Sequence, residues 1–281
     1  MRRAAAILAL GAALVAGPAR ADEAAVKQRG ELLFHIGGCT NCHTAKNGQL
    51  LAGGDPIVSP YGTFFAPNIT PDPETGIGGW TEAQFVAAMR HGRAPDGSPY
   101  YPAFPYTSYT RMTEADLGAL KAYLDTIPPV NQASKPHELG FPYNQRWGLN
   151  LWQWLFFTPE EFAPDPAKDA AWNEGAYLVL GPGHCGECHT PRNVFGALEW
   201  DHAFAGATLG KEKIPDITPN PDGGLGKWST GDLATFLKLG MTPDGDFVGS
   251  EMAKVVNNGT SKLPEPDLGG IVAYLQSLPP S

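Results

Sequence analysis

Two short segments of this chain carry residues whose types and order point to one chemistry. Cys39-Thr40-Asn41-Cys42-His43 and Cys185-Gly186-Glu187-Cys188-His189 both read C-x-x-C-H, and together they use all four cysteines of the sequence. Two thiols one helical turn apart can each add to a vinyl group of a haem, and the following His is then placed to bind the iron. The pattern predicts two covalently bound haem c groups, attached through Cys39, Cys42, Cys185 and Cys188, with His43 and His189 as proximal iron ligands.

Other uses of paired cysteines fit this arrangement less well. Zinc sites made of two C-x-x-C pairs usually hold them in one short knuckle, whereas these pairs lie in separate halves of the chain. A thioredoxin-like dithiol belongs to a βαβ pattern, which this sequence does not suggest. Neither site requires a His directly after each pair, so we retain the haem interpretation.

The N-terminus has the features of a secretory signal. Arg2 and Arg3 precede an apolar run over 4–15 that is too short to span a bilayer, and Ala19-Arg20-Ala21 matches a cleavage site. We therefore predict that residues 1–21 are a signal peptide. Haem is attached to C-x-x-C-H motifs outside the bacterial cytoplasm, so the sequence predicts a periplasmic protein, with association to a membrane-bound complex left open.

Net charge and composition limit the classes of binding partner that this chain is expected to have. The formal net charge of −9 argues against nucleic acid and anionic lipid, and it is compatible with attraction of a basic redox partner. The longest later apolar stretch, 147–157, is short and contains polar residues, so we expect no transmembrane helix in the mature chain. With 34 Gly and 27 Pro, much of the chain should form loops.

An internal repeat of about 150 residues relates the two motifs, and such a period indicates duplicated domains rather than a solenoid. The clearest matches pair Asn68-Ile69-Thr70-Pro71 with Asp216-Ile217-Thr218-Pro219, Gly79-Trp80-Thr81 with Lys227-Trp228-Ser229, and Ala122-Tyr123-Leu124 with Ala273-Tyr274-Leu275. We predict a first haem domain over 22–130, an interdomain linker over 131–171 and a second haem domain over 172–281.

Each half is predicted to contain at least three helices. The first helix enters the C-x-x-C-H motif, and Gly30 and Gly175 on these helices should allow the last helix of each half to approach closely. The second helix starts at a capping box, Thr81-x-x-Gln84 or the looser Ser229-x-x-Asp232. The last helix of the first half starts at Thr113. No convincing alternating strand pattern is present, so the predicted fold class is all-α.

The predicted linker is rich in Pro and aromatic residues. Its aromatic side chains either pack between the two haem domains or form a docking patch for a partner. We favour packing for the group made up of Trp147, Trp152, Trp154, Phe156 and Phe157.

With both halves aligned, the chain resembles two tandem class I cytochrome c domains. More closely, it is similar to the cytochrome c subunits of periplasmic or membrane-bound dehydrogenases of the alcohol and gluconate dehydrogenase type. The resemblance lies in the C-x-x-C-H motifs and in Ala52-Gly53-Gly54, Asn68-Ile69-Thr70-Pro71-Asp72, Gly78-Gly79-Trp80, Tyr101-Pro102-Ala103-Phe104-Pro105-Tyr106, Asn144-Gln145-Arg146-Trp147 and Gly183-His184-Cys185-Gly186-Glu187-Cys188-His189-Thr190-Pro191-Arg192. It implies electron transfer from a dehydrogenase to a downstream cytochrome or terminal oxidase. Those subunits often carry three haems, whereas this chain has two motifs.

The resemblance also implies a Met thioether as the sixth iron ligand. In the second half we predict Met252, on a loop before the last helix. The repeat places Phe104 at the equivalent position of the first half, and Phe cannot bind iron. We predict Met112 there, and Met89, His91 or an open iron remain as alternatives.

The Phe104 anomaly keeps a second function class in view. A haem enzyme, such as a dihaem peroxidase or a thiosulfate-oxidising cytochrome, needs an open or unusually ligated iron, and the first haem would be the candidate. A third alternative is that one haem transfers electrons while the other is structural.

Overall fold

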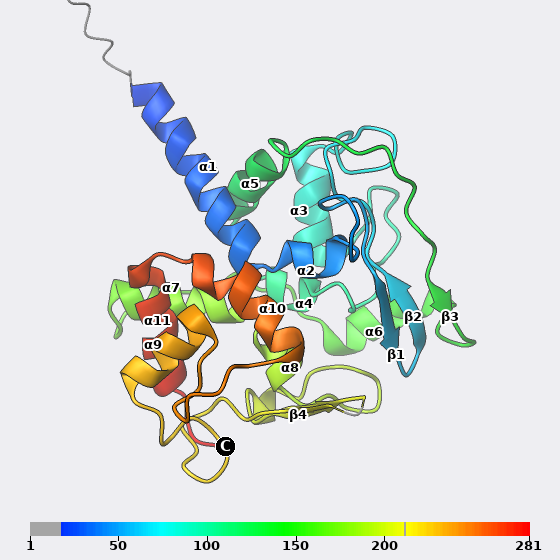
Figure 1. Ribbon diagram of the computed structural model, residues 1–281. Coiled ribbons are helices and arrows are strands. Elements are labelled where there is room, and N and C mark those ends of the chain that lie inside the picture. Colours follow the sequence, from blue (N-terminus) through cyan, green and yellow to red (C-terminus); the bar gives the residue numbers. More distant parts are fainter. Residues whose placement is uncertain (1–17, 211) are drawn as a thin grey trace, which may run out of the picture.

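The computed structural model describes residues 18–210 and 212–281, so most of the predicted signal peptide lies outside the described residues. Helices dominate this part of the chain (Figure 1). The first part of the chain contains α1 (Pro18–Ile36), α2 (Cys39–His43), β1 (Pro56–Ser59), β2 (Gly62–Phe65), α3 (Glu82–His91), α4 (Tyr106–Tyr109), α5 (Glu114–Leu124), β3 (Glu138–Leu139) and α6 (Gly148–Phe156). The later part contains α7 (Ala170–Leu180), α8 (Gly186–His189), η1 (Trp200–His202), β4 (Ala207–Leu209), β5 (Glu212–Ile214), α9 (Thr230–Leu239), α10 (Ser250–Asn258), η2 (Thr260–Lys262) and α11 (Glu265–Gln276).

Glycines let the first and last helices of each half pack backbone to backbone, as predicted. A Cβ added at Gly30 of α1 would collide with the carbonyl of Ala119 on α5. A Cβ at Gly175 of α7 would collide in the same way with the backbone of Gly270 on α11. The two crossings therefore use equivalent positions of the repeat, and any larger residue would push the helices apart.

The predicted side-chain caps of α3, α5 and α9 are present in the structure. Thr81 and Gln84 form a reciprocal capping box at the start of α3, and Ser229 and Asp232 form one at the start of α9. The Thr113 hydroxyl accepts a hydrogen bond from the backbone N–H of Asp116 at the start of α5. All three starts confirm the sequence prediction, and each cap contributes about 1 kcal/mol.

The predicted apolar faces of the helices are buried. Leu117, Leu120 and Leu124 of α5 are at most 3% exposed, and α11 buries Leu268 and Ile271 to the same degree. These residues belong to one contiguous hydrophobic cluster that includes side chains from both halves. The halves therefore share a core rather than touching only through surface contacts.

The expectation of a strand-free chain was wrong in detail, because the structure has two small antiparallel sheets. One sheet has the order β1-β2-β3, and the other is the β4-β5 hairpin. The strands are only two to four residues long, and β1 is largely exposed, so no period-two pattern of burial could develop in the sequence. Because β3 pairs with β2, part of the predicted linker belongs to a sheet of the first half.

The aromatic segment around α6 packs on one side only, so the prediction that all its aromatic residues are buried between the halves was wrong. Trp152 donates a hydrogen bond to the carbonyl of Phe195 at 2.9 Å, and Phe156 stacks on the Phe195 ring. Trp147 and Trp154, by contrast, are 72% and 79% exposed. Helical periodicity divides this run between a packed and an exposed side.

Within residues 18–210 and 212–281, no helix combines the length and the apolar character that crossing a bilayer requires.

Candidate haem-binding sites

Both C-x-x-C-H motifs form a single helical turn after a break in the chain. In the first half, α1 ends at Ile36 and the chain restarts as α2 after Gly38, whose φ of 57° is left-handed. In the second half, α7 ends at Leu180 and α8 begins after Cys185, which is preceded by His184, a non-glycine residue with φ of 40°. In each motif the helical turn brings the two cysteines to the same side, as attachment to one haem requires.

The two motif histidines are held in the same tautomer. His43 Nδ1 lies 2.7 Å from the carbonyl oxygen of Pro67, and His189 Nδ1 lies 2.8 Å from that of Pro215. A carbonyl oxygen can only accept, so Nδ1 carries the proton and Nε2 keeps its lone pair for a metal. Burial lowers the pKa of both histidines, although the hydrogen bond to the carbonyl partly opposes this, which favours the neutral ring.

None of the four cysteines forms a disulfide, so each thiol is available to add to a vinyl group. Burial raises the pKa of Cys39 and of Cys185 to about 12. Before haem is attached, the first cysteine of each motif is therefore a protonated thiol at neutral pH. Both of these cysteines are half-buried beside the hydrophobic cluster. Thiol pairs of this kind, each next to a His with a free Nε2, fit the attachment of haem c.

Two methionines share a small cavity with the first motif. A cavity of about 10 Å³ is lined by Cys39, Met89 and Met112, together with residues of α1 and α5. Met112 is 1% exposed and directly precedes the cap of α5. This places Met112 and Met89 on the same side of the first half as its motif.

Two other first-half residues that bear on the sixth iron ligand are Phe104, which the repeat aligns with Met252, and the alternative ligand His91. Phe104 packs its ring edge against Tyr109, with ring centroids 5.6 Å apart. The His91 side chain is exposed at the end of α3. The structure thus leaves the two methionines as the candidates buried beside the first motif.

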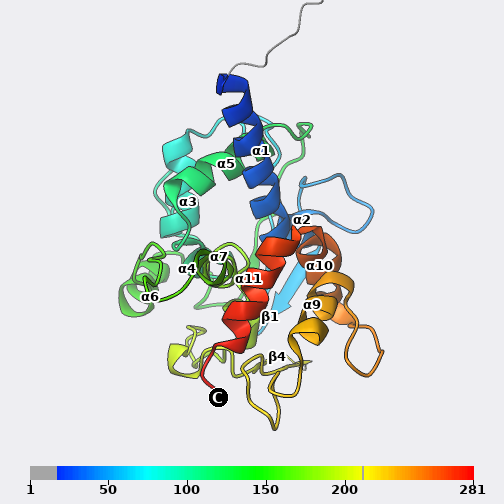
Figure 2. The same cartoon turned by 90° about the vertical axis from the view of Figure 1, so that its left-hand side faces the viewer.

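Met252 was predicted on a loop, and this was wrong: it lies on the nine-residue helix α10. Little in the sequence indicated this helix, because it follows Gly249 and Gly is a poor helix former. In the structure its first residue, Ser250, has a left-handed φ of 57°. Met252 is half-buried against the hydrophobic cluster. Helix α10 also lies beside α2 of the first half in both views (Figures 1 and 2).

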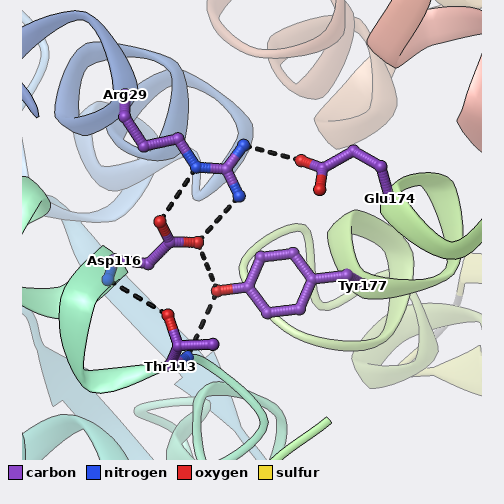
Figure 3. A network of polar contacts seen from close by, with 5 residues as sticks. All are labelled: Arg29, Thr113, Asp116, Glu174 and Tyr177. Carbon is purple, nitrogen blue, oxygen red and sulfur yellow. Dashed lines mark hydrogen bonds and ion pairs between the residues drawn. The ribbon is translucent and has the colours of Figure 1, made fainter. Parts of the chain in front are cut away.

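A polar network joins helices of the two halves at one point (Figure 3). Arg29 of α1 donates to both carboxylate oxygens of Asp116 on α5, at 2.9 and 2.7 Å, and to Glu174 on α7 at 2.6 Å. Tyr177 of α7 donates to Asp116 at 2.6 Å. Although burial opposes its charge, the hydrogen bonds to the two carboxylates raise the pKa of Arg29.

Sequence reasoning missed the groups that position the motifs. The carbonyls of Pro67 and Pro215 had a usable signal, because each precedes the matched tetrapeptide that the repeat had identified. No sequence signal pointed to Arg29, since a single charged residue on a helix is usually solvated. Asn41 and Glu187 stand at the variable positions of the motif, where the haem chemistry itself requires no particular residue.

Paired thiols followed by a His with a free Nε2, on a helical fold, define a c-type haem protein. Comparison with known proteins supports this assignment to the c-type haem proteins. Residues 27–128 match the family model described as cytochrome c. The chain is 46% identical over 263 residues to a diheme cytochrome c-type protein of Cereibacter sphaeroides, with 89% of this chain and 85% of the relative covered.

Two further relatives are named as subunits of dehydrogenases. The cytochrome c subunit of a quinone alcohol dehydrogenase from Gluconacetobacter polyoxogenes is 43% identical over 280 residues, which cover 95% of this chain and 60% of the relative. The fructose dehydrogenase cytochrome subunit of Gluconobacter japonicus is 40% identical over 265 residues, which cover 93% and 54%. The chain thus spans somewhat more than half the length of these two subunits.

This chain belongs to the cytochrome c family, and its cofactor is covalently bound haem c. The relatives named above are cytochromes or cytochrome subunits, which gives no support to the alternative of a haem peroxidase or a thiosulfate-oxidising enzyme.

Proposed function

We propose that this chain transfers electrons as a dihaem cytochrome c, taking them from a dehydrogenase and passing them to a downstream cytochrome or oxidase. The observation that carries the proposal is the double occurrence of one donor set. Each C-x-x-C-H turn is followed by a proline carbonyl that fixes the His tautomer, at Pro67 and at Pro215. The name of the Cereibacter sphaeroides relative supports a count of two haems.

Haem c, when bound, supplies an iron that alternates between Fe(III) and Fe(II). In the first half, Cys39 and Cys42 would hold the group and His43 Nε2 would bind its iron. Cys185, Cys188 and His189 would do the same in the second half. The carbonyls of Pro67 and Pro215 would keep each imidazole oriented, and the apolar cluster beside each motif would exclude water.

For the sixth ligands we propose Met112 in the first half and Met252 in the second. Burial beside Cys39 supports Met112, and a half-buried position on α10 supports Met252. The variants Met112→Ala and Met89→Ala distinguish the two first-half candidates, because only loss of the true ligand removes the methionine-to-iron absorption band of that haem. A band unchanged in Met112→Ala would disprove the assignment.

We also propose a tandem arrangement of two class I domains, over 22–130 and 172–281, joined by the linker 131–171. The matched crossings of α1 with α5 and of α7 with α11 support it. Residues 1–21 would be a signal peptide that sends the chain to the periplasm.

The names of the relatives support a proposal for the electron donor. Two of them are subunits of alcohol and fructose dehydrogenases, so we propose a dehydrogenase as the electron donor. The acceptor would be another cytochrome or a terminal oxidase. The formal charge of −9 favours a partner with a basic contact surface.

Loss of one motif at a time tests the proposal. Cys39→Ala with Cys42→Ala, and separately Cys185→Ala with Cys188→Ala, should each yield a protein with one haem by intact mass. Voltammetry should show two reversible waves in the parent and one in each variant. A parent with a single redox-active haem would show that one site is structural.

A further inference from the structure

We propose that Glu187 and Asn41, the residues enclosed by the two C-x-x-C-H motifs, are positioning residues that fasten each motif to the opposite half of the chain. A change in the first half should therefore alter the redox properties of the second haem. This inference rests on the proposed dihaem function. The motif chemistry itself requires neither residue.

Glu187 makes the stronger of the two connections. Its carboxylate oxygen Oε1 accepts hydrogen bonds from Thr107 at 2.5 Å and from Ser108 at 2.9 Å, both on α4 of the first half. The other oxygen accepts from Arg192 at 2.5 Å. Glu187 is only 7% exposed, so the two hydroxyls and the guanidinium offset the cost of burying its charge.

Asn41 makes the corresponding connection from the first motif. Its side-chain oxygen accepts a hydrogen bond of 2.7 Å from Asn258, which lies at the end of α10 in the second half. The backbone carbonyl of Asn258 is 3.1 Å from Nδ1 of His35 on α1. The C-terminal end of α10 is thus bound to both helices that lead through the first motif.

The two connections are related by the sequence repeat. With the offset that aligns Trp80 with Trp228, α10 corresponds to the segment that contains α4. Each half therefore uses the same part of its sequence to hold the motif of the other half. Arg29 and Glu174, which form an ion pair, stand directly before the equivalent Gly30 and Gly175. Reciprocal contacts of this kind are those of a two-fold symmetric pair, here within one chain.

The negative charge of Glu187 should influence the reduction potential of the second haem. A carboxylate enclosed by the motif stabilises Fe(III) more than Fe(II), and hydroxyl donors and Arg192 partly neutralise it. Removing the Thr107 and Ser108 hydroxyls leaves the carboxylate paired with Arg192 but less neutralised, so the second haem should become harder to reduce. Glu187→Gln removes the negative charge, so that haem should become easier to reduce.

The test is a redox titration of the full holoprotein, in which electron paramagnetic resonance assigns each haem. The variants are Thr107→Val with Ser108→Ala, and Glu187→Gln. The control is Thr126→Val, which removes a hydroxyl that donates to the carbonyl of Tyr123 within the first half. We expect the double variant to lower the midpoint potential of the second haem and Glu187→Gln to raise it, with the control unchanged.

The inference is overturned if the double variant leaves the second haem unchanged, or if both haems shift together in both variants. Should the double variant not fold, Ser108→Ala alone must give a smaller downward shift. A parent protein that binds no second haem would instead contradict the proposed function, so the two failures are distinguishable.

Discussion

Arg29 is predicted to contribute more to stability than other charged residues on α1, because it bridges three helices. Arg29→Ala removes three N–H···O contacts and leaves Asp116 and Glu174 without their cation. Breaking a fully buried pair costs about 3–5 kcal/mol, and exposed pairs contribute at most about 1 kcal/mol. The side chains of Arg29, Asp116 and Glu174 are 29%, 15% and 33% exposed, so we expect an intermediate loss.

We take this loss as about 2 kcal/mol. For a chain of this size it lowers the melting temperature by about 4–8 °C. The assay is thermal and urea unfolding of the holoprotein. Lys27→Ala is the matched control, because its pair with Glu23 lies on the same helix with side chains 49% and 68% exposed, and its loss should cost at most about 0.5 kcal/mol. Equal destabilisation by the two variants would refute the reasoning.

Three further predictions concern the close packing of α1, the cap of α3 and the titration of His184. Gly30→Ala should destabilise by about 1–3 kcal/mol in urea unfolding, since its Cβ meets the Ala119 carbonyl, whereas Gly269→Ala faces open space and should be neutral or stabilising. Thr81→Ala should cost about 1 kcal/mol through loss of the α3 cap, measured the same way. Burial lowers the pKa of His184, so the unfolded chain binds the extra proton and stability should fall as the pH drops below about 6.5; His184→Asn should reduce this dependence.

The sequence predicted the helices and the motifs well because their determinants are local. Capping at Thr81 and Ser229, the apolar spacing of α5 and α11, and the C-x-x-C-H turns all depend on residues within one or two helical turns. Gly30 and Gly175 could be assigned to close packing because the repeat gave two examples of one arrangement.

The missed features depend on contacts between distant parts of the chain. Strand β3 exists because β2 offers an edge about 75 residues earlier, and its two residues carry no pattern of their own. The connection from Glu187 reaches 79 and 80 residues back to Ser108 and Thr107. Helix α10 was hidden because Gly249 and Ser250 resemble a loop, although packing against α2 compensates for that poor start.

The optical spectrum of the purified holoprotein, oxidised and reduced, with haem quantified as the pyridine complex, tests the central claim most directly. The account predicts two low-spin haems per chain, a methionine-to-iron band in the oxidised state and no binding of carbon monoxide by the reduced protein. A single haem per chain, or carbon monoxide binding with a high-spin fraction near one half, would contradict it.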